Sequence, residues 1–426
     1  MCLLPDFGPA RENAAFRRLL VGGALSGIGG SMTYFAVTLQ VWDVSHSSFA
    51  VGALGLTFIP VIFLGLLGGS IADNVDRRKL VLVMSCFLAL ISALFALQAY
   101  ANLGLLWPLY LLTMIQAMLG AVSAPARRTF MPRLLSPEQL RAGVALQTLS
   151  GRVTMLAGPA LAGVVAGAWG LRTCYAIDAV SYAAAVYSTV RLPAMPATPA
   201  MRASDIKRAV RSLHSIAEGL RFIRHHPVLT AAFLTDLDAM LLGLPVALFP
   251  ALNAAHFGGR PQTLGLLTAA VGVGGIFSAV LSGPASRAVR QGWGMLAGTM
   301  IWGAAIAGFG LSRNLALALG MLAIAGAADT LTVTFRASMV QIVTPDEFRG
   351  RVSSVEYIIG AGGSPVGNVE AGTVAALTSP VFSAVSGGIG CVAAAVLIAL
   401  AFPAFRRYHG ERAEEPAPTV EVISTS

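Results

Sequence analysis

Long apolar runs separated by short polar segments dominate the chain. A helix needs roughly 20 apolar residues to cross the hydrocarbon layer of a bilayer, and the runs are long enough for this. The pattern predicts twelve transmembrane helices, at residues 18–42, 48–72, 80–100, 107–125, 142–168, 173–192, 228–252, 263–283, 294–312, 315–337, 352–377 and 380–403. We therefore expect an all-α integral membrane protein.

The longest polar segment divides the predicted spans into two sets. We expect an N-terminal six-helix half at 1–192, a cytoplasmic linker at 193–226, a C-terminal six-helix half at 227–408 and a disordered cytoplasmic tail at 409–426. The linker opens with Pro193-Ala-Met-Pro-Ala-Thr-Pro, which is typical of a connecting segment. Apolar residues then recur at helical spacing from Ile206 to Ile223, which predicts an amphipathic helix on the inner membrane surface.

An internal repeat supports this division. The segment from Ser136 reads Ser-Pro-Glu-Gln-Leu-Arg, and the segment from Thr344 reads Thr-Pro-Asp-Glu-Phe-Arg. Each segment follows the fourth span of its half, which indicates a parallel repeat of two six-helix units. We expect Ser136 and Thr344 to cap the helices that follow, each with proline at the first helical position.

Composition and charge agree with a membrane location. Hydrophobic residues make up 56% of the 426 residues and charged residues only 12%, whereas soluble domains carry about a quarter charged residues. The net charge of +9 comes from Lys and Arg between the spans, so it marks topology rather than nucleic-acid binding. On the predicted outer side only Arg172, Arg260 and Arg313 occur, which places both termini in the cytoplasm.

The chain shows no sequence pattern of an enzyme or of a metal centre. No phosphate-binding loop, nucleophile motif or paired-cysteine spacing occurs. We expect no cofactor, no metal and no nucleic-acid partner. We also expect a monomer in the cell membrane of a bacterium, surrounded by lipid.

The segment between the second and third predicted spans carries a distinctive motif. It reads Gly69-Ser-Ile-Ala-Asp-Asn-Val-Asp-Arg-Arg-Lys79. Together with two six-helix halves and a basic central segment, this motif resembles the major facilitator superfamily. The family pattern is glycine, three residues, aspartate, arginine, any residue, glycine and two basic residues. The chain departs from it at Asn74, where the family has arginine, and at Asp76, where the family has glycine.

Further segments narrow the resemblance. Ile177-Asp-Ala-Val-Ser181 and Thr344-Pro-Asp-Glu-Phe-Arg-Gly-Arg351 resemble the branch that contains enterobactin exporters and macrolide efflux proteins. In the fifth span, Gly158, Pro159 and Gly163 resemble an element of exporting antiporters. This favours export over import, although close helix packing alone also explains these residues.

The resemblance implies a gate at the cytoplasmic side. Gly69 would allow close helix packing, Asp73 would accept hydrogen bonds from the first turn of the eleventh span, and Arg77 would pair with a nearby acid. Arg78 and Glu356 belong to the same expected gate. A purely topological role for the basic residues of the motif is the alternative.

Ionisable residues inside the spans are the candidates for substrate and proton binding, because charges at this depth are costly and usually functional. Asp236 and Asp329 are the first choices, since the resemblance implies that spans seven and ten line the central cavity. Asp238 lies two residues from Asp236 and should face the opposite side of its helix. The remaining candidates are Arg152, Glu370 and Gln116.

Two other intramembrane charges have structural interpretations. We expect Arg336 at the inner membrane boundary, because its counterpart in the repeat, Arg128, lies there. We expect Asp178 to cap a helix near the outer end of the sixth span.

These features favour a secondary active transporter. We expect proton-coupled export of an amphiphilic small molecule, such as a siderophore or a drug-like compound, by alternating access. Uptake, or lysophospholipid flipping on the same fold, is the alternative. A receptor or scaffold that transports nothing is a third hypothesis, for which the polar regions of this chain look small.

Overall fold

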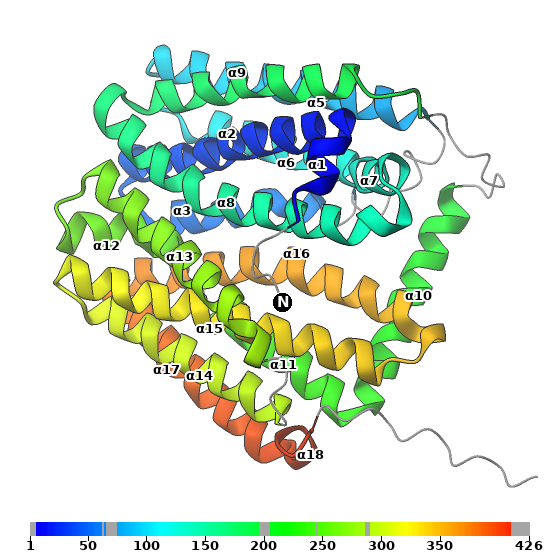
Figure 1. Ribbon diagram of the computed structural model, residues 1–426. Helices are drawn as coiled ribbons and strands as arrows, with labels where there is room; N and C mark the ends of the chain where they lie inside the picture. The colour runs from blue at the N-terminus through cyan, green and yellow to red at the C-terminus, as the bar shows by residue number, and fades with distance from the viewer. Residues whose placement is uncertain are drawn as a thin grey trace, which may run out of the picture.

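The computed structural model of the chain describes residues 6–61, 64, 75–195, 205–243, 246–285 and 290–409, with the backbone alone for 205–214 and 279–285. These residues form helices joined by short connections, and no β-strand occurs among them. Figure 1 shows the long helices side by side in one bundle. The all-α prediction is confirmed. The predicted disordered tail lies, from residue 410 on, outside the described residues.

The helices before and after the central segment form two groups (Figure 1). The N-terminal group comprises α1 (Gly8–Glu12), α2 (Ala14–Ser45), α3 (Ser48–Ala53), η1 (Leu54–Phe58), α5 (Arg77–Tyr100), α6 (Leu106–Arg128), α7 (Phe130–Leu134), α8 (Pro137–Trp169) and α9 (Leu171–Val190). The C-terminal group comprises α11 (Pro227–Leu242), η2 (Val246–Leu248), α12 (Phe249–His256), α13 (Pro261–Ala285), α14 (Gln291–Leu311), α15 (Leu315–Val343), α16 (Asp346–Leu377), α17 (Pro380–Ala401) and α18 (Pro403–Arg406). Helix α10 (Asp205–His225) lies between the groups in sequence.

Nine helical segments of the described chain are long and apolar enough to cross a membrane. They coincide with predicted spans. Helices α9 and α16 and the apolar stretch that begins with α3 are not among the nine, and part of that stretch lies outside the described residues. The number of twelve spans and the boundaries of the two halves therefore stay predictions.

Side-chain caps explain where several helices begin. Asn13 and Ser136 accept hydrogen bonds from backbone N–H groups in the first turns of α2 and α8, as Ser136 was predicted to do. The prediction for Thr344 is wrong. Helix α16 begins only at Asp346, and the Thr344 hydroxyl is buried without a hydrogen-bond partner among the described residues, because Pro345 takes the capping position.

The seventh predicted span, 228–252, is interrupted. Helix α11 ends at Leu242 and α12 begins at Phe249. Gly243 follows the last residue of α11, and Pro250 lies in the first turn of α12. Proline has no backbone N–H to donate. It is therefore tolerated in the first turn of a helix, where it interrupts the run of backbone hydrogen bonds from the segment before it.

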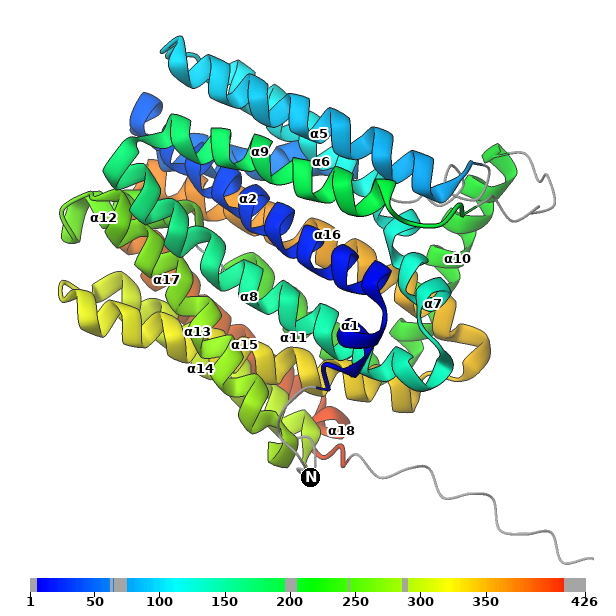
Figure 2. The ribbon, with the colours of Figure 1, turned by 45° about the horizontal axis from the view of Figure 1, so that its top comes forward.

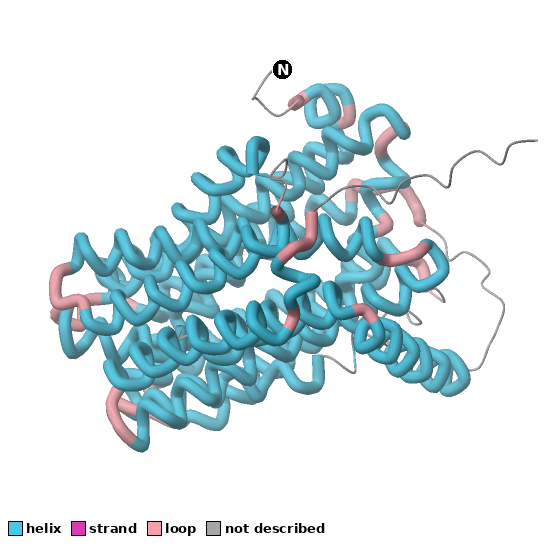
Figure 3. Tube along the Cα trace, turned by 90° about the horizontal axis from the view of Figure 1, so that it is seen from below, coloured by secondary structure: helices cyan, strands magenta, loops and turns pink. Residues whose placement is uncertain are grey.

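The described ends of the chain lie toward the same end of the bundle. Figure 2 shows α1, α7, α10 and α18 on one side and α12 on the opposite side. Figure 3 shows that the loops gather near the ends of the long helices. We call the two sides the α1 end and the α12 end.

The two helix groups meet at the α12 end. Helix α3 contacts α16, and α8 contacts α13. A Cβ at Gly163 would lie 2.9 Å from the Cα of Gly265, and a Cβ at Gly265 would lie 2.9 Å from the Cα of Gly163. Only glycine permits this approach, so these contacts close the α12 end between the groups.

Helix α10 packs against α16 of the C-terminal group. Ile216 and Ile223 join an apolar cluster with Val355 of α16. Glu218 Oε2 lies 2.9 Å from Arg351 Nε at the start of the same helix. The helical prediction is confirmed, these apolar side chains find partners in the C-terminal group, and the membrane-surface position stays a prediction.

Candidate functional site

A buried ion pair joins α15 to α11. Arg336 Nη1 donates a hydrogen bond to Asp236 Oδ2, and Arg336 Nη2 lies 3.4 Å from Glu356 Oε1 of α16. Arg336 is 9% exposed and Asp236 is 4% exposed. Two acids from neighbouring helices thus hold the Arg336 guanidinium inside the bundle, and its predicted position at the inner membrane boundary stays a prediction.

Asp329 and Arg152 extend this arrangement. Asp329 lies two helical turns before Arg336 on α15, and it interacts electrostatically with Asp236, Arg152 and Arg336. Arg152 belongs to α8, in the N-terminal group, and its Nη1 would lie 3.6 Å from a Cβ at Gly275 of α13. The charges therefore link the two helix groups.

We call Asp236, Asp329, Glu356, Arg152 and Arg336 the charged cluster. Three of its members are acids and two are arginines. With every group ionised, one negative charge has no matching positive charge. Such an excess is costly in a low-dielectric surrounding, so the cluster is suited to bind a proton or a cationic group.

Asp238 faces the other side of α11, as its spacing from Asp236 predicts. The Cys391 Sγ of α17 lies 3.8 Å from Asp238 Oδ2. Asp238 Oδ1 has no hydrogen-bond partner among the described residues, although Asp238 is only 8% exposed. The two neighbouring aspartates therefore have different surroundings.

Gln116 and Glu370 are not brought into the charged cluster. Gln116 of α6 interacts with Tyr182 of α9. Glu370 of α16 is half-buried and makes no hydrogen bond or ion pair within the described part of the chain. Gln116 thus joins two helices of the N-terminal group, and the contacts of Glu370 assign it no role.

The predicted gate is only partly described. Gly69 and Asp73 lie outside the described residues. The backbone N–H of Arg77 donates to the Met195 carbonyl at 3.2 Å, which ties the start of α5 to the end of the N-terminal group. Glu356, predicted as a gate residue, contacts Arg336 of the charged cluster.

Asp76, which stands where the family pattern has glycine, has a structural role at the start of α5. The Asp76 side chain accepts hydrogen bonds from the backbone N–H groups of Arg78 at 2.9 Å and Lys79 at 3.1 Å, so it caps α5. Arg78 Nη2 also donates to the Val190 carbonyl at the end of α9, at 2.5 Å. This part of the motif stabilises the α1 end of the N-terminal group.

Gly158, Pro159 and Gly163 lie at close helix contacts. A Cβ at Gly158 would lie 3.1 Å from Ser31 Oγ of α2, and a Cβ at Gly163 would lie 2.8 Å from the Pro261 carbonyl of α13. Helix α8 runs on through Pro159. At these positions α8 packs closely against α2 of its own group and against α13 of the C-terminal group.

Asp178 forms a second buried polar cluster, which the sequence interpretation missed. Its Oδ2 accepts hydrogen bonds from Thr33 of α2 and Ser92 of α5, each at 2.7 Å, and Ser181 Oγ lies 3.4 Å from its Oδ1. Asp178 is 0% exposed, in the middle of α9. The predicted capping role is therefore wrong, because hydroxyl groups from neighbouring helices surround the carboxylate.

Two cavities lie in the N-terminal group. One, of about 310 Å³, is lined by residues of α2, α6 and α8 that include Phe16, Leu20, Arg127 and Gln147. It therefore combines an apolar wall with polar groups.

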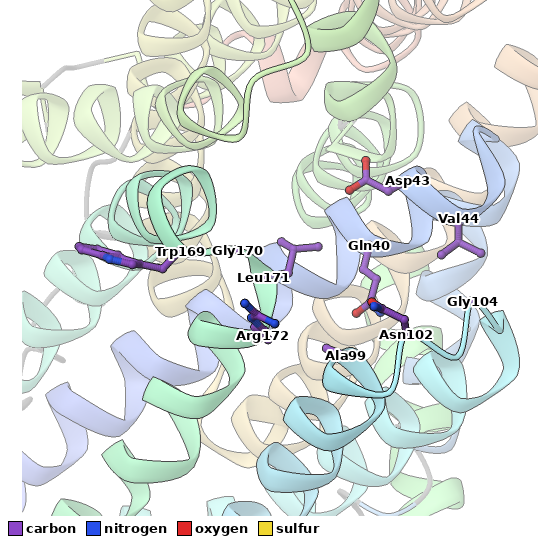
Figure 4. Close-up of a pocket in the computed structure, with 10 residues that line it drawn as sticks. All are labelled: Gln40, Asp43, Val44, Ala99, Asn102, Gly104, Trp169, Gly170, Leu171 and Arg172. Atoms are coloured by element: carbon purple, nitrogen blue, oxygen red, sulfur yellow. The ribbon is translucent and has the colours of Figure 1, made fainter.

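The second cavity, of about 400 Å³, lies at the α12 end beside Gln40, Asp43 and Arg172 (Figure 4). Gln40 is held there by hydrogen bonds with Gln98 and Tyr175. Neither cavity is lined by a member of the charged cluster. Within the described residues, no group of three or more His, Cys, Asp or Glu side chains could hold a metal ion.

Comparison with known sequences agrees with this architecture. A family model described as transmembrane secretion effector, of the major facilitator type, matches residues 5–423. The enterobactin exporter EntS of Escherichia coli O1:K1 is 27% identical over 402 residues, which cover 93% of this chain and 94% of that protein. The enterobactin exporter EntS of Citrobacter koseri is 27% identical over 412 residues, 96% of each chain.

Solved structures share the fold. A POT family transporter in complex with 5-aminolevulinic acid has a TM-score of 0.72 at 12% identity, covering 92% of this chain and 97% of that one. The nucleoside transporter NupG has a TM-score of 0.68 at 14% identity, covering 92% and 99%. At such identities the similarity shows the fold alone.

The sequence resemblance is thus confirmed by the family match and by relatives along nearly the whole chain. The matched proteins are membrane transporters rather than enzymes. The chain belongs to the transmembrane secretion effector family of the major facilitator superfamily, and it is a multi-pass membrane transporter.

Proposed function

We propose that this transporter is a proton-coupled exporter of an amphiphilic small molecule, working by alternating access in the inner membrane of a bacterium. The observation that carries the proposal is the charged cluster, whose additional acid can hold a proton where the two helix groups approach each other. The names of the enterobactin exporters among its relatives support export and a siderophore-like substrate.

Protonation would change how the helices hold together. When an acid of the charged cluster takes up a proton, the negative charge opposite Arg336 or Arg152 is lost and the attraction weakens. Helices α8, α11, α15 and α16 can then shift relative to one another. A proton thereby favours one arrangement of the two groups over the other, which is the coupling that alternating access requires.

We place the α1 end in the cytoplasm. Arg11 in α1, Arg224 in α10 and Arg406 in α18 lie at this end, in accord with the excess of basic residues on the inner side of membrane proteins. The contact of Gly163 with Gly265 would then close the outer side. An exporter takes up its substrate from the cytoplasm, so an outer side closed by this contact suits export.

The cavity between α2, α6 and α8 supports an amphiphilic substrate. Its volume is about 310 Å³, and Phe16 and Leu20 contribute apolar surface. Arg127 and Gln147 supply a positive charge and an amide on the same wall. A compound with an apolar body and a polar or anionic group matches this lining.

The cytoplasmic gate is part of the proposal. Asp73 would hold the start of α16 when the inner side closes, and Gly69 and Arg77 would support that contact. Asp73→Asn should leave the protein in the membrane but reduce transport strongly. Wild-type transport by a well-expressed Asp73→Asn variant would contradict this role. We expect the transporting unit to be a monomer.

A gene deletion tests the function directly. Cells with and without the gene are compared by untargeted mass spectrometry of cell extracts and medium. Export predicts a compound that accumulates in the deletion strain and is lost from its medium, and a protonophore should produce the same accumulation in wild-type cells. Loss of a compound's entry would indicate uptake instead.

Purified protein in vesicles separates the remaining alternatives. Movement of a labelled lysophospholipid between leaflets would favour lipid flipping over export. Tight binding of the deletion strain's compound without flux would favour a receptor. Efflux that persists unchanged in the presence of a protonophore would reject proton coupling.

A further inference from the structure

Asp238 lies where α11 crosses α14 and α17. Its Oδ2 lies 3.8 Å from the Cys391 Sγ, and the same sulfur lies 3.8 Å from the Thr299 carbonyl of α14. Asp238 Oδ1, Thr299 Oγ1 and Trp302 Nε1 are buried and have no hydrogen-bond partner within the described residues. The carboxyl group is therefore more than nine-tenths buried with one weak donor beside it.

No cation balances this carboxyl group. Helices α14 and α17 contain no charged residue, and Cys391 is the titratable group that they present to Asp238. Arg336 of α15 and Glu356 of α16 interact with Asp236, on the other side of α11. Among the described residues, no ion pair reaches Asp238.

The two aspartates of α11 therefore differ in charge state. Asp236 accepts a hydrogen bond from a guanidinium, which stabilises the carboxylate. A carboxylate at Asp238 would be buried with no cation nearby and with a thiol as its one donor among the described residues, which is far more costly than the neutral acid. Two nearby acids whose surroundings differ often take different roles in proton transfer.

The geometry points to Asp238 as a second proton-holding residue of the transport cycle, in addition to the acid of the charged cluster, while Asp236 stays ionised beside Arg336. This assignment rests on the proposed proton-coupled transport. Asp238 holds the proton while α11, α14 and α17 are packed together. When the crossing opens to water, the O–H bond of Asp238 breaks, the proton passes to water, and the carboxylate becomes hydrated.

Helix α11 connects this event to the charged cluster. Asp236 and Asp238 are two residues apart on one helix, so a movement of α11 that hydrates Asp238 also displaces Asp236 from Arg336. Helix α11 ends at Leu242, four residues after Asp238. Release of the proton is thereby tied to rearrangement of the contacts that hold α15 and α16.

Infrared spectroscopy of the purified protein tests the assignment without a substrate. The wild-type protein should show the carbonyl stretch of a buried, protonated carboxylic acid in neutral buffer, and alkaline buffer should remove it. Asp238→Asn should lose the component of this band that comes from Asp238, whereas Asp346→Asn should keep the whole band, because Asp346 is an exposed acid at the start of α16. A difference spectrum between wild type and Asp238→Asn that shows no lost component, or a component lost in Asp236→Asn instead, overturns the assignment.

Asp238→Glu keeps the test decisive if Asp238→Asn does not fold. The longer side chain retains a carboxyl group in altered surroundings, so the band should remain but shift in frequency. An unshifted band would assign the proton to another acid.

Transport by the same variants gives an independent readout. In cells that export the compound identified by the deletion experiment, Asp238→Asn should abolish accumulation of that compound against its gradient. Export by Asp238→Asn that a protonophore still reduces as strongly as in the wild type overturns the assignment. Wild-type export that is unchanged by a protonophore would instead reject the proposed proton-coupled function. Failure of the Asp238 assignment and failure of the proposed function are therefore distinguishable.

Discussion

Arg336 and Asp236, from helices α15 and α11, form an ion pair across a hundred positions of the sequence. Both residues are buried, and Glu356 of α16 lies 3.4 Å from the same guanidinium. One arginine therefore holds three helices of the C-terminal group together. Asp329 interacts electrostatically with this pair and also with Arg152 of the N-terminal group, so the state of the pair affects the contact between the two helix groups.

Removal of the Asp236 charge should destabilise the protein. Asp236→Asn leaves the buried Arg336 with Glu356 as its remaining close acid, and loss of one partner of a buried pair costs about 3 kcal/mol. Thermal unfolding in detergent measures the change.

A double variant separates the interaction energy of the ion pair from the other effects that each substitution has on stability. Asp236→Asn combined with Arg336→Gln should lose less stability than the sum of the single variants, since neither Arg336 nor Asp236 is then left without its partner. Strict additivity would show that the ion pair contributes nothing.

Substitution of Asp178 should affect stability rather than transport. Asp178→Ala leaves the hydroxyls of Thr33 and Ser92 without their buried acceptor, which should cost about 2 kcal/mol. Asp178→Asn retains one acceptor oxygen and should lose less. Unfolding in detergent measures stability, and export per folded molecule should stay near the wild-type value; a normal unfolding temperature for Asp178→Ala would refute the prediction.

A larger side chain at Gly163 should open the α12 end. A Cβ there would lie 2.9 Å from the Cα of Gly265 and 2.8 Å from the Pro261 carbonyl, so Gly163→Val forces α8 away from α13. Spin labels on these helices should report a longer distance than in the wild type. Gly151→Ala is the matched control on α8, because a Cβ at Gly151 meets nothing within 4 Å. An unchanged distance in Gly163→Val would mean that the contact does not limit the approach of the two groups.

Loss of the ion pair between Glu218 and Arg351 should lower the export rate more than it lowers the free energy of unfolding. Both side chains are about one-third exposed, so the pair contributes less than about 1 kcal/mol. Glu218→Arg should nevertheless separate α10 from the start of α16 by charge repulsion, and it should lower the export rate.

Charge exchange is the control for this prediction. Glu218→Arg combined with Arg351→Glu should recover much of the rate, because the pair forms again with reversed sign. Equal rates for the double variant and for Glu218→Arg alone would show that α10 acts through other contacts.

The sequence by itself determined the helices and the family. Apolar runs of sufficient length have one stable state in a bilayer, because every backbone N–H and C=O must be satisfied within the helix. Helix-start signals such as Ser136 followed by proline depend on contacts within one helical turn. They could therefore be predicted without knowing which other helices pack nearby. The opposite orientations of Asp236 and Asp238 also followed from helix geometry alone.

Only the tertiary structure decided which charges meet. Arg336 was expected at a membrane boundary, but its position beside Asp236 and Glu356 depends on how α11 and α16 pack against α15. Asp178 was expected to cap a helix, yet its partners come from α2 and α5. Long-range partners are selected by the packing of whole helices, and a local pattern of residues contains no record of which helices will be adjacent.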